Sequence, residues 1–155
     1  MSEKKKEEIG LNQEQIAEAT KERLKKYDGL NFFEEFSMFM GTAQILEFGL
    51  KKLLENKFEY SLDDMEKWTL GKIKTELEKN DLRKDFIILL KSVVDYRNYI
   101  AHELMANVGL MGALFKEVLP KDHYSKDHRL LHKAIYELEQ LVFLFDWNNE
   151  NDAWE

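Results

Sequence analysis

The 155-residue chain contains no cysteine and only one proline, Pro120. Without cysteine, neither a disulfide framework nor a thiolate metal site is available, and a reducing cytoplasm is the expected location. One proline and seven glycines leave few turn or breaker signals, so long uninterrupted helices are favoured. The longest uncharged stretch, residues 104–115, is shorter than the roughly 18 residues that a membrane span requires, so we expect a soluble protein with no membrane partner.

Charge of positive sign is also scarce. The net charge is −7, and residues 134–155 contain six acidic residues but no lysine or arginine, which leaves −1 for the rest of the chain. A strongly acidic protein does not bind long nucleic acids through charge alone, because phosphate binding depends on basic surface. A nearly neutral body can still form a local basic pocket, so contact with a nucleic acid is expected to be short and confined to one site.

Apolar residues recur at intervals of three and four almost throughout, which predicts an all-α domain, an antiparallel up-and-down bundle of four to five helices. We expect one domain over residues 1–155, with an ordered core at about 12–147 and a fraying acidic tail at 148–155. The N-terminal lysines precede no apolar segment, so a signal peptide is not expected. The expected helices cover about 12–27, 31–53, 69–80, 81–104 and 130–145, with caps at Ser61 and Asp81 and a polar loop at 120–127.

The second expected helix carries more apolar residues than one neighbouring helix would cover. Met38, Ile45 and Phe48 lie beside its main apolar stripe, and Gly41 and Gly49 would let another helix approach closely. Monomers rarely expose large apolar patches, so this surplus favours a homodimer. A more deeply buried central helix explains the same pattern equally well.

The fourth expected helix ends in the sequence Asp95-Tyr96-Arg97-Asn98-Tyr99-Ile100-Ala101-His102. Arginine is permanently charged and matches phosphate oxygens with a planar fork, whereas histidine accepts and donates protons near neutral pH. An arginine and a histidine are the two side chains that can cleave RNA without a metal. Five residues at about 100° each separate Arg97 from His102 by roughly 140°, so the two converge on one phosphate only if the helix is distorted or a second protomer contributes.

This pattern resembles the HEPN superfamily (higher eukaryotes and prokaryotes nucleotide-binding), whose signature is an arginine, a polar residue and a histidine four to six residues after the arginine. Arg97, Asn98 and His102 match it. The resemblance extends to Gln44 and Glu47 in the long second helix and to Thr69-Leu70-Gly71. It implies a dimeric endoribonuclease of a toxin–antitoxin or phage-defence system, with Arg97 and His102 as catalytic residues, Asn98 and Asp95 as supporting residues, and no cofactor or metal.

The chain departs from one branch of this superfamily. Toxins paired with a minimal nucleotidyltransferase carry a tyrosine two residues after the histidine, where the antitoxin attaches AMP, but this chain has Leu104 there. Control by that route is therefore in doubt, although an antitoxin or regulatory protein of another kind remains a possible partner.

Two other interpretations of the motif remain open. The bundle can be a non-catalytic dimeric module that binds a nucleotide through Arg97, or Arg97 can be an ion-pair partner of Asp95 or Glu103 while His102 interacts with the helix dipole. Elsewhere, His128 and His132 are four residues apart and can ligate zinc from one helix face, with His123 or Asp127 nearby, although surface histidines without a metal are commoner.

Overall fold

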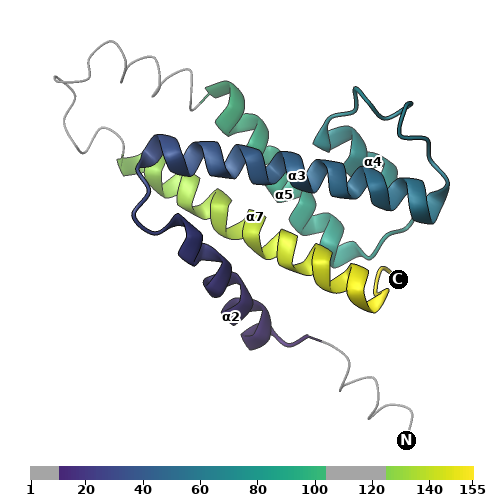
Figure 1. Cartoon of the computed structure of the whole chain (residues 1–155), viewed down its shortest axis with the longest axis horizontal. Coiled ribbons are helices and arrows are strands. Elements are labelled where there is room, and N and C mark those ends of the chain that lie inside the picture. Colours follow the sequence, from purple (N-terminus) through teal and green to yellow (C-terminus); the bar gives the residue numbers. More distant parts are fainter. Residues whose placement is uncertain (1–10, 104–124) are drawn as a thin grey trace, which may run out of the picture.

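The computed structural model describes residues 11–103 and 125–155, and all regular structure in these ranges is helical (Figure 1). The predicted all-α class is therefore confirmed. None of the helices in these ranges is long and apolar enough to cross a membrane. The elements are α2 (Gln13–Leu24) with the 3₁₀ turn η1 (Lys25–Tyr27), α3 (Phe32–Phe58), α4 (Leu70–Lys79), α5 (Lys84–Tyr99) and α7 (Ser125–Asn151).

Side-chain caps set the starts of three helices. Asn12 and Asn31 each form a capping box with the third residue of the following helix, Gln15 and Glu34 respectively. Each asparagine oxygen accepts a backbone N–H that has no partner within the helix, so the helix begins at that residue. Thr69 caps α4 by accepting from the backbone N–H of Lys72. These starts agree with those predicted near 12, 31 and 69.

The two other predicted caps are wrong. Ser61 begins no helix, because residues 62–67 form turns before Thr69 caps α4. Asp81 adopts a left-handed backbone conformation with φ of 55°, and α5 begins only after Arg83, whose own side chain makes no capping bond. The chain needs this turn to reverse direction between α4 and α5. Asp81 therefore acts as a turn residue, a role that aspartate tolerates well.

Helix α7 lies at the centre of the bundle. It packs against α2, α3 and α5, which surround it in Figure 1. Helices α3 and α7 run parallel, because Glu35 contacts His132 near their starts and Gly49 contacts Phe145 further along. The residues of α7 that are fully buried by these neighbours are Leu131, Ala134, Leu138, Glu139 and Leu141.

Helix α4 breaks the alternating order that the short connections predict. It begins beside the middle of α3, where Leu70 and Gln44 line the same cavity, and it continues towards Tyr60, whose hydroxyl bonds to Glu76. Helices α3 and α4 therefore point the same way. The connector at 59–69 makes this possible because it folds back along α3. Its own residue Met65 is fully buried, which fixes the connector against the core.

The end of the chain is ordered, contrary to the predicted fraying of residues 148–155. Helix α7 continues to Asn151, and the side chain of Trp154 is buried against Phe86 at a ring-centroid distance of 5.0 Å. The backbone N–H of Arg83 donates to the carbonyl of Trp154 at 2.9 Å, and the Arg83 guanidinium donates to the carbonyl of Ala153 at 3.1 Å. These bonds hold the chain end against the start of α5. A period-based pattern misses them because only one large apolar residue carries the contact.

A buried carboxylate joins α2 to α7. Glu139 has no solvent exposure, and it pairs with Arg23 at 2.8 Å, with Lys26, and with the hydroxyl of Tyr27 at 2.9 Å. Burial beside this carboxylate raises the pKa of the Tyr27 phenol well above its usual range. A buried charge without partners is costly, so replacing Glu139 or the residues of α2 and η1 that pair with it would destabilise the α2–α7 contact.

A second carboxylate, Glu76 of α4, fixes the connector. One oxygen accepts from Lys72 at 2.9 Å and Lys79 at 3.1 Å, and the other accepts from the Tyr60 hydroxyl at 2.9 Å. The hydroxyl of Tyr60 also accepts from Asn80. The hydrogen bond from Lys72, followed by those from Lys79 and Tyr60, lowers the pKa of Glu76 to about 2.

This lowered pKa predicts a pH-dependent contribution to stability. In the unfolded chain the Glu76 pKa returns to 4.5, so the folded state is favoured by the ionised carboxylate above that pH and loses this advantage as pH falls towards 2. We expect Glu76→Gln to be less stable than the wild type at pH 5–7, and the difference to disappear by about pH 2. Urea unfolding of both proteins across this range measures it. Tyr60→Phe should show a weaker form of the same trend, whereas a difference that stays constant down to pH 2.5 would contradict it.

Candidate functional site

Arg97 lies near the end of α5, beside the buried residues Val93, Val94 and Ile100 that fix this part of the helix against the core. Its side chain lines a small cavity of about 170 Å³ between α3, α4 and α5. The same cavity is lined by Gln44 and Glu47 of α3 and by Leu70 of α4. The structure thus brings Arg97 together with two α3 residues and one α4 residue singled out in the sequence.

The guanidinium of Arg97 is not neutralised by an ion pair within the described residues. Asp95, Glu103 and Glu47 all lie beyond salt-bridge distance of it, and its hydrogen bond is to the neighbouring Asn98 side chain, at a long 3.4 Å. An arginine that serves as a structural ion-pair partner would show a short bond to a carboxylate. Among residues 11–103 and 125–155, therefore, no carboxylate is paired with Arg97 in a way that would compete with an anionic ligand.

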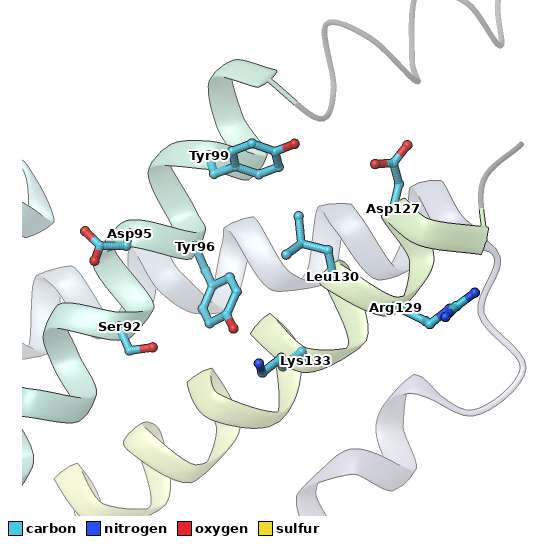
Figure 2. Close-up of a pocket in the computed structure, with 8 residues that line it drawn as sticks. All are labelled: Ser92, Asp95, Tyr96, Tyr99, Asp127, Arg129, Leu130 and Lys133. Carbon is cyan, nitrogen blue, oxygen red and sulfur yellow. The ribbon is translucent and has the colours of Figure 1, made fainter.

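Asp95 does not join Arg97. It lines a separate and larger pocket, of about 620 Å³, on the side of α5 that faces α7. Tyr96 and Tyr99 project from α5 into this pocket, opposite Leu130 and Lys133 of α7 (Figure 2). Residues 95 and 97 therefore belong to different pockets on two sides of one helix. Asp95 therefore lies apart from the Arg97 cavity, and its supporting role stays a prediction.

His102 is exposed and lies within a local change in the helix. From residue 100 to residue 103 the α-helix widens into a π turn. Such turns are rare and occur frequently at functional sites. Because each residue of a π turn rotates by less than in an α-helix, the angular offset between Arg97 and His102 is smaller than an ideal α-helix predicts. No hydrogen bond joins the two side chains, so the imidazole and the guanidinium remain separate groups within one chain.

An exposed apolar surface on α3 adjoins the Arg97 cavity. Ile45 and Phe48 are 74% and 59% exposed, and Gly41, one turn before Ile45, lines the cavity with open space where a Cβ would be. Gly49 is different, because a Cβ there would lie 3.0 Å from the Phe145 ring of α7. Of the two glycines predicted to admit a second helix, Gly49 thus lies against Phe145 of the same chain. The space beside Gly41 is open.

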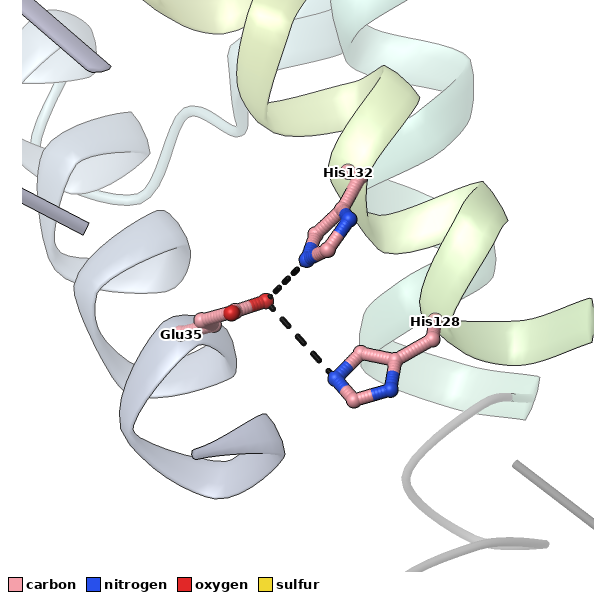
Figure 3. A group of neighbouring side chains, drawn as sticks. All are labelled: Glu35, His128 and His132. Carbon is pink, nitrogen blue, oxygen red and sulfur yellow. Dashed lines mark hydrogen bonds and ion pairs between the residues drawn. The ribbon is translucent and has the colours of Figure 1, made fainter. Parts of the chain in front are cut away.

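Two histidines that the sequence marks as possible ligands are joined by a carboxylate from another helix. His128 and His132 of α7 both face Glu35 of α3 (Figure 3). Of the further ligands considered, His123 lies outside the described residues, and Asp127 lines the pocket beside Tyr99. Glu35 was missed from sequence, because it stands 97 positions from His132 and no local pattern signals so distant a pairing.

Comparisons of the chain with protein-family models, with curated proteins and with solved structures find no match.

Proposed function

We propose that this protein is a metal-independent endoribonuclease of the HEPN type, active as a homodimer in the cytoplasm as a toxin or phage-defence component. The observation that carries the proposal is the Arg97 guanidinium, which lines a cavity without a carboxylate partner among the described residues. An exposed histidine follows it on a distorted helix end. A free guanidinium suits the phosphoryl oxygens, and an exposed imidazole suits proton transfer.

The proposed reaction needs only groups of this chain and the RNA. Neutral His102 removes the proton of a ribose 2′-hydroxyl, and the 2′-oxygen attacks the adjacent phosphorus. Arg97 stabilises the negative charge that gathers on the phosphoryl oxygens. The bond from phosphorus to the 5′-oxygen then breaks, and the partner subunit's His102 supplies the proton to that oxygen. The products are a 2′,3′-cyclic phosphate and a free 5′-hydroxyl.

A second copy of the chain completes this site. The α3 surface formed by Gly41, Ile45 and Phe48 adjoins the Arg97 cavity, so a two-fold contact over this surface brings two arginines close to one cleft. Large exposed aliphatic and aromatic side chains are unfavourable in water and favour such a contact. This exposed surface therefore supports the proposed homodimer.

The Tyr96–Tyr99 pocket supplies a secondary feature, because aromatic rings stack on bases without strong sequence preference. Its charged lining is balanced, with Arg129 and Lys133 against Asp95 and Asp127, and it lies on the other side of α5 from the Arg97 cavity. A base that stacks there makes a contact outside the cavity where cleavage is proposed. Such a contact is local, as expected for a protein whose net charge is −7.

The test is cleavage of single-stranded RNA in the presence of a chelator. The expected products carry free 5′-hydroxyl ends, which a polynucleotide kinase labels directly, and 2′,3′-cyclic phosphate ends, which resist 3′-end ligation until acid opening and phosphatase treatment expose a 3′-hydroxyl. A requirement for magnesium, or products with 3′-hydroxyl ends, would contradict the mechanism. Binding of a nucleotide without any cleavage would instead favour the non-catalytic regulatory module.

Expression in bacteria tests the biological role separately. A toxin should arrest growth, and the arrest should be relieved by a cognate antitoxin or regulatory protein encoded nearby. If growth is unaffected while the purified protein cleaves RNA, the activity is held in check inside the cell, and a defence role is favoured.

A further inference from the structure

Glu35, His128 and His132 form a three-residue cluster where α3 and α7 begin side by side. The Oε2 atom of Glu35 lies 2.7 Å from Nε2 of His132 and 3.9 Å from Nε2 of His128. One potential ligand atom from each residue lies within 4.8 Å of the others. Both imidazoles approach the same carboxylate oxygen (Figure 3). The three side chains therefore converge on one point.

The spacing matches the requirements of a small d-block cation. Zinc binds imidazole nitrogen and carboxylate oxygen at about 2.0–2.2 Å, so ligand atoms around a tetrahedral ion are roughly 3.3–3.5 Å apart. The two measured separations, 2.7 Å and 3.9 Å, lie on either side of this value. A small rotation of the two histidine side chains, which moves their ring nitrogens by a few tenths of an ångström, brings both separations to the value expected around zinc. Two histidines and a glutamate are also a known zinc ligand set.

The backbone holds this ligand set in place. His128 and His132 are four residues apart on one helix, which places their rings on the same face, with centroids 5.1 Å apart. The His128 ring also packs edge-on against the Phe32 ring at 5.1 Å, which restricts its rotation. Glu35 is buried, so its carboxylate has few alternative positions. A prearranged set of ligands binds a cation without a large loss of conformational entropy.

The site is open to solvent on one side. The side chain of His132 is 59% exposed and that of His128 is 38% exposed, whereas that of Glu35 is 10% exposed. An ion can therefore enter between the two imidazoles and reach the carboxylate behind them. Three protein ligands leave a fourth position for water or for another ligand.

We propose that Glu35, His128 and His132 bind one zinc ion, which ties the start of α7 to the start of α3. In the absence of the ion, the hydrogen bond between Glu35 and His132 holds the same contact. Because the ligands are imidazoles and a carboxylate, the site selects zinc and similar d-block ions over magnesium and calcium, which prefer sets made only of oxygen ligands. The proposal is independent of the ribonuclease activity, and its test needs no RNA.

The test uses the purified full-length chain, stripped with a chelator and titrated with cobalt and zinc. Cobalt at a site of this kind gives visible absorption bands that saturate at one ion per chain and vanish when zinc displaces it. His132→Ala should weaken binding by more than the roughly 10- to 100-fold that loss of an outer-shell partner costs, and His128→Ala should do the same. His102→Ala removes an exposed histidine outside the cluster and should leave binding unchanged.

Three results would overturn the proposal. They are an absence of saturable cobalt binding in the wild type, equal binding by the wild type and His132→Ala, and equal affinity for magnesium and zinc. Circular dichroism of each variant establishes that it is folded. Zinc should also raise the melting temperature of the wild type but not that of Glu35→Gln, and X-ray absorption of the zinc-loaded wild type should show two imidazoles in the coordination shell.

Discussion

Replacing His102 with alanine is expected to reduce the rate of RNA cleavage by about 10²–10⁴-fold, the typical contribution of a positioned general acid or base. The reason is that the proposed reaction has no other group to remove the 2′-hydroxyl proton or to protonate the leaving oxygen. Because His102 is exposed, the substitution leaves no cavity, and the melting temperature should not change. Single-turnover cleavage of a labelled RNA measures the rate.

Glu103→Ala is the matched control, since Glu103 is the next residue in the same π turn and is also exposed. It should retain near-wild-type cleavage. Arg97→Lys keeps the positive charge but loses the planar fork, so it should be impaired although it is a conservative change. Unchanged cleavage in His102→Ala would remove the imidazole from the mechanism and, with it, the proposed function.

A mixture of inactive variants tests whether the site spans two protomers. In a symmetric dimer, a heterodimer of Arg97→Ala and His102→Ala protomers keeps one intact combination of Arg97 from one chain and His102 from the other. Random association makes half of the dimers heterodimers, and each has one Arg97 and one His102 from different chains but lacks the second imidazole, so co-expression should restore less than a quarter of wild-type activity. If the two residues act within one chain, the mixture stays inactive. Ile45→Asp should weaken the dimer and abolish the rescue.

Replacing Trp154 with alanine is expected to destabilise the fold by about 3–5 kcal/mol, the usual cost of removing a large aromatic side chain from a core. Trp154 is fully enclosed, packs edge-on against Phe86, and lies 5.8 Å from the ring of Phe145. Its indole N–H also donates to Asn149 at 3.0 Å. The substitution leaves a cavity between α5 and α7. Urea unfolding measures the lost free energy of unfolding. Thermal unfolding should show a melting temperature lower by about 10 °C or more.

Trp147→Ala provides the comparison for this prediction. Trp147 is partly buried and lines a surface pocket, so its removal should cost clearly less than the removal of Trp154. Deletion of residues 153–155 should destabilise the protein about as much as Trp154→Ala, since it removes the same indole and the carbonyls that accept from Arg83. Equal stability of Trp154→Ala and the wild type would mean that the chain end does not contribute to the core.

Local signals explain why most helix starts could be predicted. A cap acts within three residues, so Asn12, Asn31 and Thr69 reveal themselves in the sequence. Apolar spacing likewise identifies the stripes of α3 and α7. The direction of α4 and the docking of Trp154 depend instead on contacts between distant segments, which no local period encodes. The predicted cap at Asp81 is wrong because aspartate serves equally well as a helix cap and as a left-handed turn residue.

In the candidate site, too, local sequence signals could be recognised and contacts between distant segments could not. The sequence predicts Arg97, Asn98 and His102 as site residues from their spacing, and in the structure Arg97 lines a cavity with Gln44, Glu47 and Leu70. It also predicts a supporting role for Asp95, which lines the pocket between α5 and α7 and not the Arg97 cavity. The partnership of Glu35 with two histidines could not be foreseen, because it depends on α3 and α7 running parallel.

The central place of α7 has a consequence for how the chain is made. Helices α2, α3 and α5 all pack against α7, which is the last of the described helices in the sequence. A ribosome adds roughly 5–20 residues per second, so the three earlier helices leave the exit tunnel seconds before the helix that covers their apolar faces. The bundle therefore closes only after α7 has also left the tunnel, and the apolar faces of the earlier helices stay uncovered until then.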